Sequence, residues 1–407
     1  MKNLIQRAMP ELKFAQRIRI VKTPTPIIAL AVSTSTLAAE RLVPSQYPTI
    51  QAAIDAAANG DFVRISPGTY IEALEMNGKA LTIAGDPSAA SVILRPAGNS
   101  KIVTIADNAA GSSSFRNLTF TGGVTQNVVT VTAGNPTFEY CLFRDNQAAA
   151  LLDSRACGAS EGATLRHCLF LNNGSPNGGA TYLYETNSVF EDCVFAGNRA
   201  TGPTGGVNAG GACYVNDWGC GTHTFRFSRC IFTDNSAVWG GAIYAQGTYP
   251  NAPTRLIIDG CTFANNSASS GSAIFNWYIT CPVAQSSYCG PGDHIRNGWS
   301  DGGENAFYAN CSPLPFPDCN GDGVPDSIQT ELGLLPDRNG DGIPDGCQCI
   351  GDIVANGQID GADLAAVVSN WGPASASGIS RACDTNGDGA VSGADLGFLL
   401  TIWGPCR

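Results

Sequence analysis

The chain of 407 residues is short of basic side chains after its N-terminal segment. No lysine follows Lys101, and the three histidines, His167, His223 and His294, stand in unrelated contexts without the spacing of metal ligands. A basic patch is the electrostatic requirement for binding nucleic acid, and none occurs after residue 38. These absences exclude a nucleic-acid partner and give no reason to predict a histidine-based metal site.

Long apolar runs are also missing outside the first 38 residues. No later stretch stays apolar for eighteen residues, so we expect no membrane-spanning segment in the mature chain. Residues 1–38 combine a basic beginning, an apolar stretch from Ile27 to Leu37 and small residues at the end, which predicts an export signal peptide. Sixteen cysteines agree with an oxidising destination, extracellular or on the cell surface.

Residues 39–312 contain a repeat that decides the predicted fold. Five segments follow the pattern Cys-x-Phe-x-x-Asn, and each has a large apolar residue three positions before its cysteine. The five triplets are Cys141, Phe143 and Asn146; Cys168, Phe170 and Asn173; Cys193, Phe195 and Asn198; Cys230, Phe232 and Asn235; and Cys261, Phe263 and Asn266. Successive side chains of a strand alternate between its two faces, so positions −3, 0 and +2 cannot all face inward from one flat strand. The chain must bend between them.

Two short strands joined by a bend, recurring every 25 to 37 residues, are what one coil of a parallel β-helix requires. Neighbouring coils pair at about 4.8 Å, which places phenylalanine over phenylalanine and asparagine over asparagine. Glycine pairs such as Gly178-Gly179 and Gly210-Gly211 follow the asparagine and allow the turn into the next strand.

Two parts of this region resemble known families. The combination of F-x-x-N with G-G-A-I is similar to the passenger repeats of polymorphic outer-membrane autotransporters, which are adhesive β-helices. Residues 43–55 and 60–70 resemble the opening of pectin-lyase-like right-handed β-helices, with a capping helix before the first coil. The resemblance implies an all-β right-handed parallel β-helix, a solenoid, over residues 39–312.

The last 58 residues repeat one pattern at an interval of 32 residues. In the second copy, oxygen side chains occupy loop positions 1, 3, 5, 9 and 12 and glycine occupies position 6, which is the spacing of a calcium loop. The first copy has Val354 at position 3, so we expect a looser site there. The predicted ligands are Asp384, Asn386, Asp388, Ser392 and Asp395 in the second copy, and Asp352, Asn356, Asp360 and Asp363 in the first.

Each loop leads into an apolar helical stretch that ends in Trp-Gly-Pro. The tandem resembles the type I dockerin module, which implies a small α-helical, calcium-binding domain over residues 349–407 that binds a cohesin. The family usually carries small hydroxyl residues at loop positions 10 and 11, where the partner is read. Here the pairs are Gly361-Ala362 and Gly393-Ala394. This difference affects the expected recognition of a cohesin and does not affect the predicted calcium ligands.

A second acidic pair lies in residues 313–348, where D-x-N-x-D-G-x-P-D occurs twice. It resembles the calcium repeats of the thrombospondin type 3 family, although position 12 is Gln329 or Gln348 and neither copy is a complete EF-hand loop. The alternative is a disordered acidic linker. The predicted ligands are Asp318, Asn320, Asp322, Asp326, Asp337, Asn339, Asp341 and Asp345. Residues 313–407 carry a net charge of −10 out of the chain's −11, so the acidity is local to the predicted calcium sites.

The cysteines divide into two groups. The five of the repeat are expected to pack in the core as small apolar side chains. Those expected to form disulfides, with a pairing that sequence cannot fix, are Cys213, Cys220, Cys281, Cys289, Cys347, Cys349, Cys383 and Cys406.

No catalytic residue can be assigned from the sequence. The carboxylates of the middle region form no recognisable pair of the kind that glycosidases need. Aromatic residues after the glycine turns could form a platform for sugars, and Trp218, Trp277 and Trp299 are the predicted ligand contacts.

Three functions remain open. We favour a secreted, non-catalytic calcium-binding β-helix that adheres to glycans or surface proteins and is attached through its C-terminal module. The alternatives are a polysaccharide-degrading lyase or glycoside hydrolase, and a structural spacer.

Overall fold

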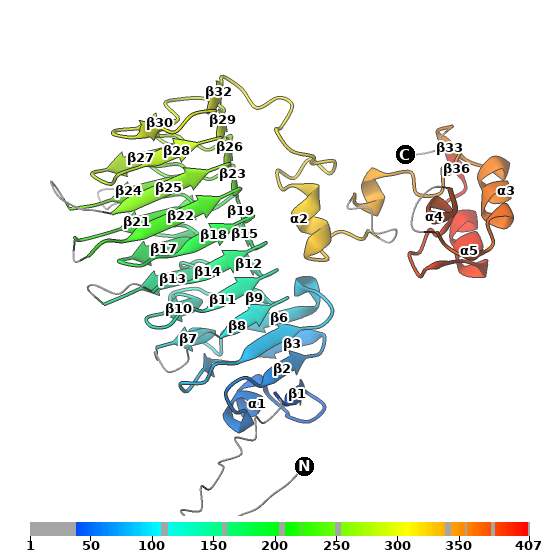
Figure 1. Ribbon diagram of the computed structural model, residues 1–407, viewed down its shortest axis with the longest axis horizontal. Coiled ribbons are helices and arrows are strands. Elements are labelled where there is room, and N and C mark those ends of the chain that lie inside the picture. The colour runs from blue at the N-terminus through cyan, green and yellow to red at the C-terminus, as the bar shows by residue number, and fades with distance from the viewer. Residues whose placement is uncertain are drawn as a thin grey trace, which may run out of the picture. The chain divides into compact units, whose positions relative to one another are not determined.

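The computed structural model describes residues 38–106, 113–156, 161–202, 208–219, 221–248, 254–337, 343–354, 356–375 and 379–405. Within them, three long parallel sheets run along a stack of coils (Figure 1). Sheet A contains β1 (Glu40–Val43), β2 (Phe62–Ile65), β5 (Thr82–Gly85), β8 (Ser114–Arg116), β11 (Thr137–Glu139), β14 (Thr164–Arg166), β18 (Val189–Glu191), β22 (Thr224–Ser228), β25 (Arg255–Asp259), β28 (Pro282–Ala284) and β31 (Ser300–Asp301).

The other two sheets follow the same order along the chain. Sheet B contains β3 (Gly68–Ile71), β6 (Val92–Arg95), β9 (Thr119–Thr121), β12 (Leu142–Arg144), β15 (Leu169–Leu171), β19 (Val194–Ala196), β23 (Ile231–Thr233), β26 (Thr262–Ala264), β29 (Ser287–Cys289) and β32 (Ala306–Tyr308). Sheet C contains β4 (Leu74–Glu75), β7 (Val103–Ile105), β10 (Val129–Val131), β13 (Leu151–Ser154), β17 (Thr181–Tyr184), β21 (Cys213–Asn216), β24 (Ile243–Gln246), β27 (Ile274–Trp277) and β30 (Ile295–Arg296). A short pair, β16 (Gly174–Ser175) and β20 (Arg199–Ala200), lies between sheets B and C along the chain.

A single residue with left-handed backbone turns the chain from sheet A to sheet B. In successive coils it is Asn117, Tyr140, His167, Asp192 and Arg229, with φ between 49° and 53°. This bend separates the apolar residue at −3, which lies on sheet A, from the phenylalanine at +2, which lies on sheet B. The predicted bend is confirmed, and both side chains face the interior.

The predicted aromatic column fills that interior. Phe170 stacks on Phe143 and Phe195 with ring centroids 4.6 and 4.7 Å apart, and all three are fully buried. The asparagines form the expected ladder, since Asn173 donates from Nδ2 to Oδ1 of Asn198 at 3.0 Å. Asn146 donates in the same way to Asn173 at 2.9 Å. Each buried amide is therefore satisfied by the next coil, which fixes the register.

The glycine pairs are required by crowding as well as by backbone angle. Gly178 has φ of 64°, and a Cβ there would lie 2.0 Å from the carbonyl oxygen of Thr181. A Cβ on Gly179 would lie 2.1 Å from the carbonyl oxygen of Gly211 in the next coil. No side chain larger than hydrogen fits either position.

Helix α1 (Ile50–Ala56) closes the N-terminal end of the coil stack. Thr49 caps it by accepting a hydrogen bond from the backbone of Ala52, and Ile50, Ala53 and Ile54 are fully buried against the first coils. The predicted capping helix is thus present. A 3-10 turn, η1 (Ala89–Ser91), precedes β6.

Helix α2 (Asp326–Glu331) packs on the outer face of sheet B. Ile328 and Leu332 are buried against outward-facing Leu142, Leu169 and Val194 of three successive strands. Backbone and side-chain contacts reinforce the packing, because Ala90 donates to the carbonyl of Leu332 at 3.2 Å and Glu331 lies 3.3 Å from His167 Nδ1. These contacts favour an ordered segment over a disordered linker.

The C-terminal tail is a small unit with approximate twofold symmetry. It contains η3 (Asp345–Cys347), α3 (Gly361–Ser369), α4 (Ile379–Cys383) and α5 (Gly393–Thr401). Strand β33 (Gln358–Ile359) pairs with β36 (Gly404–Pro405), and β34 (Gly372–Pro373) pairs with β35 (Ala390–Val391), both antiparallel. Each loop therefore pairs with the residues that follow the other loop's helix. Val367, Leu399 and Cys383 form the centre of its own core.

The cysteine prediction is correct for the repeat and partly wrong elsewhere. Disulfides join Cys289 to Cys311 and Cys319 to Cys347, and Cys349 is also in a disulfide. Cys213, Cys281 and Cys383, which we expected to be bridged, are free and buried because their side chains pack into apolar cores. Cys220 and Cys406 lie outside the described residues. The free cysteines that the structure describes are Cys141, Cys168, Cys193, Cys213, Cys230, Cys261, Cys281 and Cys383.

These eight free thiols are expected not to react in the native protein. Burial raises the pKa of the Cys281 thiol to about 12 and raises those of Cys168, Cys193 and Cys230 further. Only the thiolate is nucleophilic, and these side chains are also inaccessible. Alkylation followed by peptide mass spectrometry should modify the eight in denatured protein and leave them unmodified in native protein. Rapid native labelling of the Cys168–Cys193 column would contradict the packing.

Candidate functional site

The outer face of sheet C presents a column of aromatic rings. Tyr182, Tyr214, Tyr244 and Phe275 occupy equivalent register positions in β17, β21, β24 and β27. Centroids of successive rings are 5.0, 5.1 and 5.5 Å apart, and the rings are close to parallel. Strand alternation places them outward while Leu183, one residue after Tyr182, faces the core. Tyr214, Tyr244 and Phe275 are only 4, 5 and 7 % exposed, so the column is a small buried aromatic cluster outside the main core.

Amide side chains lie beside this column. The hydroxyls of Tyr214 and Tyr244 donate to Gln246 Oε1 at 3.1 and 3.4 Å, and Asn216 Nδ2 donates to the hydroxyl of Tyr182 at 3.2 Å. Burial raises the pKa of the Tyr214 and Tyr244 phenols, so both stay protonated and act as donors. The face combines flat rings with fixed polar groups, which is the composition of small-molecule sites.

The column opens into a pocket of about 550 Å³ at its C-terminal end. Tryptophan and tyrosine rings are accessible here, since Trp239, Trp277 and Tyr278 are 38, 44 and 52 % exposed. Phe275 forms part of the pocket and lies 5.9 Å from Trp277 and 6.3 Å from Trp239, between ring centroids. The volume falls within the usual range of roughly 300 to 1,000 Å³ for ligand sites.

The three predicted tryptophans have different surroundings. Trp277 lines the pocket. Trp218 is 63 % exposed in the turn after β21 and is not one of the lining residues. Trp299 is half-buried against the end of the core, with its ring centroid 6.1 Å from that of Phe307.

Sequence reasoning placed Trp239 only in the wider group of aromatic residues near the glycine turns, and it missed Phe275 and Arg296, which also line the pocket. The spacing of the repeat could have identified Phe275, because Phe275 follows its glycine turn at the same interval as Tyr244 does in the preceding coil. Trp239 precedes the glycine pair instead, and its approach to Phe275 depends on how the coils are stacked.

Charged side chains on sheet A are paired with one another. Arg116 contacts Glu139 at 2.7 Å, and Arg166 contacts Glu139 at 3.7 Å and Glu191 at 2.7 Å. These residues form an alternating ladder on successive coils, and partial exposure limits each pair's stabilisation to about 1 kcal/mol or less. The carboxylates of this ladder are therefore engaged in structural contacts.

A second group of charges is sealed inside the coils. Arg155 lies 2.7 Å from Asp153, and His223 Nδ1 lies 2.8 Å from Asp217 Oδ2. All four side chains are at most 1 % exposed. The Asp217–His223 pair has the contact expected of a catalytic dyad, but a polymer cannot reach it in this conformation.

The acidic loops of the tail share one hydrogen-bond pattern. Asp384 accepts from the backbone N–H groups of Asp388 and Gly389 at 3.1 and 2.9 Å. Asp352 accepts from the equivalent Asn356 and Gly357 at 2.8 and 2.7 Å. The position-1 carboxylate thus organises both loops in the same way.

The upstream loop repeats this pattern. Asp318 accepts from Asp322 and Gly323 at 3.2 and 2.9 Å. Asp326 is buried and accepts from the backbone of Cys319 at 3.2 Å. In the other upstream repeat, Asp337 and Asp345 are partly buried, whereas Asn339 and Asp341 lie outside the described residues.

The position-12 carboxylates begin the helices that follow the loops. Asp395 completes a capping box with Ser392 at the start of α5, and Asp363 does so with Asp360 at the start of α3. Asp363 and Asp395 are fully buried. Residues 349–407 contain six Asp, no Glu and two Arg, so the loops concentrate negative charge that a cation would offset.

Tight clusters of metal-binding atoms are rare in the part of the chain that the structure describes. The group of three within 4.8 Å consists of Cys319, Asp326 and Cys347, whose sulfurs form a disulfide and are not available as thiolates. The loop carboxylates are spread further apart, each directed at N–H groups of its own loop.

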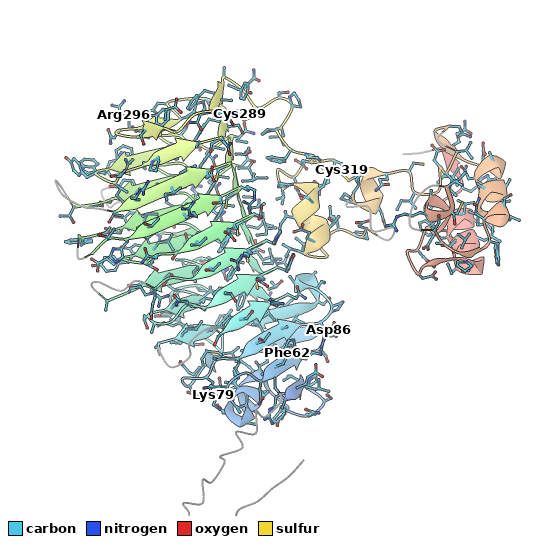
Figure 2. All side chains as sticks on the ribbon, in the orientation of Figure 1. Phe62, Lys79, Asp86, Cys289, Arg296 and Cys319 are labelled. Atoms are coloured by element: carbon cyan, nitrogen blue, oxygen red, sulfur yellow. A yellow bond between two sulfur atoms is a disulfide. The ribbon has the colours of Figure 1, made fainter. Side chains whose placement is uncertain are left out.

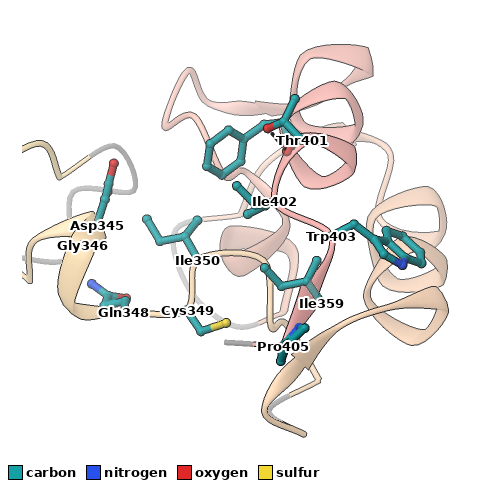
Figure 3. Close-up of a pocket in the computed structure, with 11 residues that line it drawn as sticks. Asp345, Gly346, Gln348, Cys349, Ile350, Ile359, Thr401, Ile402, Trp403 and Pro405 are labelled. Carbon is teal, nitrogen blue, oxygen red and sulfur yellow. Dashed lines mark hydrogen bonds between the residues drawn. The ribbon is translucent and has the colours of Figure 1, made fainter. Parts of the chain in front are cut away.

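A pocket of about 590 Å³ lies in the tail, between residues 345–359 and the end of α5 (Figure 3). Ile350, Ile359, Ile402 and Trp403 contribute most of its apolar wall, and Asp345 lies at one side. The duplication is imperfect here, because Ile402 follows α5 at the position where Asn370 follows α3. Both copies line the pocket, with Ile350 and Ile359 from the first and Ile402 and Trp403 from the second.

Two family models match this chain. Residues 102–286 match the model described as the right handed beta helix region, and residues 350–400 match the dockerin type I domain. The chain carries a right-handed β-helix and a type I dockerin domain. The dockerin domain coincides with the duplicated loops and with helices α3 to α5.

Solved structures with similar folds include carbohydrate-related proteins at low identity. A pectin methyl esterase from the rice weevil is 12 % identical with a TM-score of 0.37, covering 67 % of this chain and 88 % of that one. The tailspike protein gp49 of Acinetobacter baumannii bacteriophage Fri1, a capsular polysaccharide depolymerase, is 13 % identical with a TM-score of 0.43, covering 67 % and 55 %. Similarity at this level supports no conclusion about the activity or ligand of this chain.

A curated relative matches a short part of the chain. The metabotropic glutamate receptor-like protein P of Dictyostelium discoideum is 32 % identical over 104 residues, which are 25 % of this chain and 6 % of that protein. The match therefore spans a small fraction of the relative. Among the described residues, no helix is both long and apolar enough to cross a membrane.

Proposed function

We propose that this protein is exported, binds glycans through the pocket on sheet C, and is attached to a cohesin-bearing partner by its dockerin domain. The observation that carries the glycan assignment is the group of exposed rings, Trp239, Trp277 and Tyr278, in the pocket at the end of the buried aromatic column. Flat rings bury the apolar face of a sugar, and the neighbouring amides supply hydrogen bonds to its hydroxyls.

A binding role without catalysis is supported by the chemistry of the pocket wall. Hydrolysis of a glycosidic bond needs two carboxyl groups that flank it. Within the described residues, no Asp or Glu lines this pocket. Glu139 and Glu191 on sheet A are paired with arginines, and Asp153 and Asp217 are inaccessible.

Calcium is the cation whose chemistry fits the dockerin loops. Hard cations of this size take six to eight oxygen ligands from side chains and backbone carbonyls. The second loop would hold calcium with Asp384, Asn386, Asp388, Ser392 and Asp395, and the first with Asp352, Asn356, Asp360 and Asp363. Bound calcium offsets the repulsion between these carboxylates. The upstream sites, at Asp318 to Asp326 and Asp337 to Asp345, would bind in the same manner with fewer ligands.

Attachment through the dockerin domain places the partner surface at the starts of α3 and α5. Gly361, Ala362, Gly393 and Ala394 are exposed there, on both halves of the duplicated domain. Small side chains leave the backbone accessible but supply no hydroxyl groups, so a cohesin would have to recognise shape and main-chain atoms. Pull-down with cohesin domains in the presence and absence of calcium tests this part.

Replacing Trp277 or Trp239 with alanine is expected to abolish most glycan retention. Truncating a central aromatic contact costs about 2 kcal/mol or more of binding energy, which is roughly thirtyfold in affinity. Affinity electrophoresis in gels containing individual polysaccharides measures this directly. Trp218→Ala is the matched control, because Trp218 is exposed but does not line the pocket. Equal losses in all three variants, at unchanged melting temperature, would place the binding site elsewhere.

A further inference from the structure

The outward column of sheet C changes from aromatic to cationic in the last coil. Arg296 in β30 pairs in register with Phe275 in β27, and so continues the column of Tyr214 and Tyr244. Figure 2 shows Arg296 at the end of the coil stack, beside β30. A ligand in the pocket at the end of this column would therefore meet a guanidinium beside the exposed rings of Trp239 and Trp277.

Arg296 is the one charged side chain among the described residues that line the pocket. Its side chain is 59 % exposed, and its Nη1 lies 3.8 Å from Oδ2 of Asp293. The other oxygen of Asp293, Oδ1, accepts a hydrogen bond from the backbone of Gly271 at 2.9 Å. Arginine carries five N–H donors in a planar fork, so this one long ion-pair contact leaves donors for a ligand.

Because the chain as a whole is acidic, the positive charge of Arg296 determines whether the pocket attracts an anionic ligand. The chain has a net charge of −11, which gives no general attraction for anions. At physiological salt, charges more than about 8 Å apart are largely screened, so local groups determine which ligand is accepted. A single guanidinium beside stacked rings matches a sugar ring that carries a planar or tetrahedral oxyanion, because two parallel N–H groups can pair with two of its oxygens.

We propose that the pocket selects anionic glycans, and that Arg296 recognises the carboxylate or sulfate group of the bound sugar. This inference rests on the proposed glycan binding. The exposed rings of Trp239 and Trp277 hold the sugar face whatever its charge, and Arg296 adds discrimination between charged and neutral forms.

Binding is measured by calorimetry on the full-length protein in calcium, with four probes. Short galacturonic acid oligomers and their methyl-esterified forms differ only in the carboxylate, while dextran sulfate and dextran differ only in the sulfate. Native protein is expected to bind at least one anionic probe about tenfold more tightly than its neutral counterpart, as charge-assisted hydrogen bonds predict. Added salt should reduce this preference.

Arg296→Gln is expected to remove the preference and leave neutral binding unchanged, whereas Trp277→Ala should weaken binding of charged and neutral forms alike. Arg255→Gln, which removes an exposed arginine on sheet A, is the charge-matched control and should behave like native protein.

A preference that survives in Arg296→Gln, or native protein that binds neutral forms as tightly as charged ones, overturns the role of Arg296 while glycan binding stands. Native protein that binds none of the four probes overturns this inference, and unaltered binding in Trp277→Ala overturns the pocket itself.

Discussion

Removal of calcium is expected to unfold the dockerin domain and leave the β-helix folded. The domain has a small core centred on Val367 and Leu399, and six aspartates repel one another when no cation is bound. Binding of a structural metal and folding are then one process. Circular dichroism of residues 349–407 should lose most of its helical signal with a chelator and regain it with calcium.

Substitution of the two position-1 aspartates should give unequal effects. Asp384→Ala is expected to weaken calcium binding about tenfold more than Asp352→Ala, because the second loop has the fuller set of oxygen ligands and the first has Val354 at position 3. Calcium titration of each variant measures this difference. A helical signal that is indifferent to chelator, or a stronger effect of Asp352→Ala, would contradict the assignment.

Phe195→Ala is expected to destabilise the β-helix by about 3 to 5 kcal/mol. Phe195 is fully buried and stacks at 4.7 Å on both Phe170 and Phe232, so truncation leaves a cavity between two coils. Thr164→Ser, on the outer side of sheet A, should change stability by no more than about 0.5 kcal/mol. Urea unfolding followed by tyrosine and tryptophan fluorescence compares the two.

The choice of control matters, because outward position does not guarantee exposure. Ala196 follows Phe195 and faces away from the coil interior, yet it is buried in the cluster that includes α2. A substitution there would also disturb the contacts of Ile328. Similar destabilisation by Phe195→Ala and Thr164→Ser would mean that the inward column is wrongly assigned.

The β-helix could be predicted because its repeat imposes fixed relations between residues. Phe170 and Asn173 recur with their cysteine at constant spacing, and a coil that returns to the same register must stack each residue on its equivalent. The left-handed bend at His167 follows from the same spacing, since positions −3 and +2 both face inward. Such constraints are local and repeated, so a single sequence contains them several times.

The sequence repeat does not predict which distant segments of the chain contact each other. Leu142, Leu169 and Val194 are apolar at outward positions, which indicates that something covers them, but the pattern does not identify α2 as the segment. Disulfide pairing has the same difficulty. Cys281 packs into the core while Cys289 is bridged to Cys311, although both precede the acidic linker by similar distances.

The pocket illustrates the limit for functional sites. Trp218, Trp277 and Trp299 were all expected in loops, but Trp277 is the last residue of β27 and lines the pocket, Trp218 lies outside the pocket and Trp299 is packed against the core. Their directions depend on loop lengths in adjacent coils. The calcium loops, in contrast, carry their predicted ligands within twelve consecutive residues, so the sequence alone is enough to propose them. Calcium binding at these loops stays a proposal, which the loop geometry supports.

The most direct test is to measure binding and turnover on the same polysaccharide samples. Purified full-length protein is incubated with acidic and neutral polysaccharides, and retention, new reducing ends, new unsaturated ends and released methanol are recorded together. A non-catalytic glycan-binding β-helix predicts retention of at least one polysaccharide without any of these products. Product formation that disappears when one carboxylate or arginine near sheet C is replaced would contradict it and establish an enzyme.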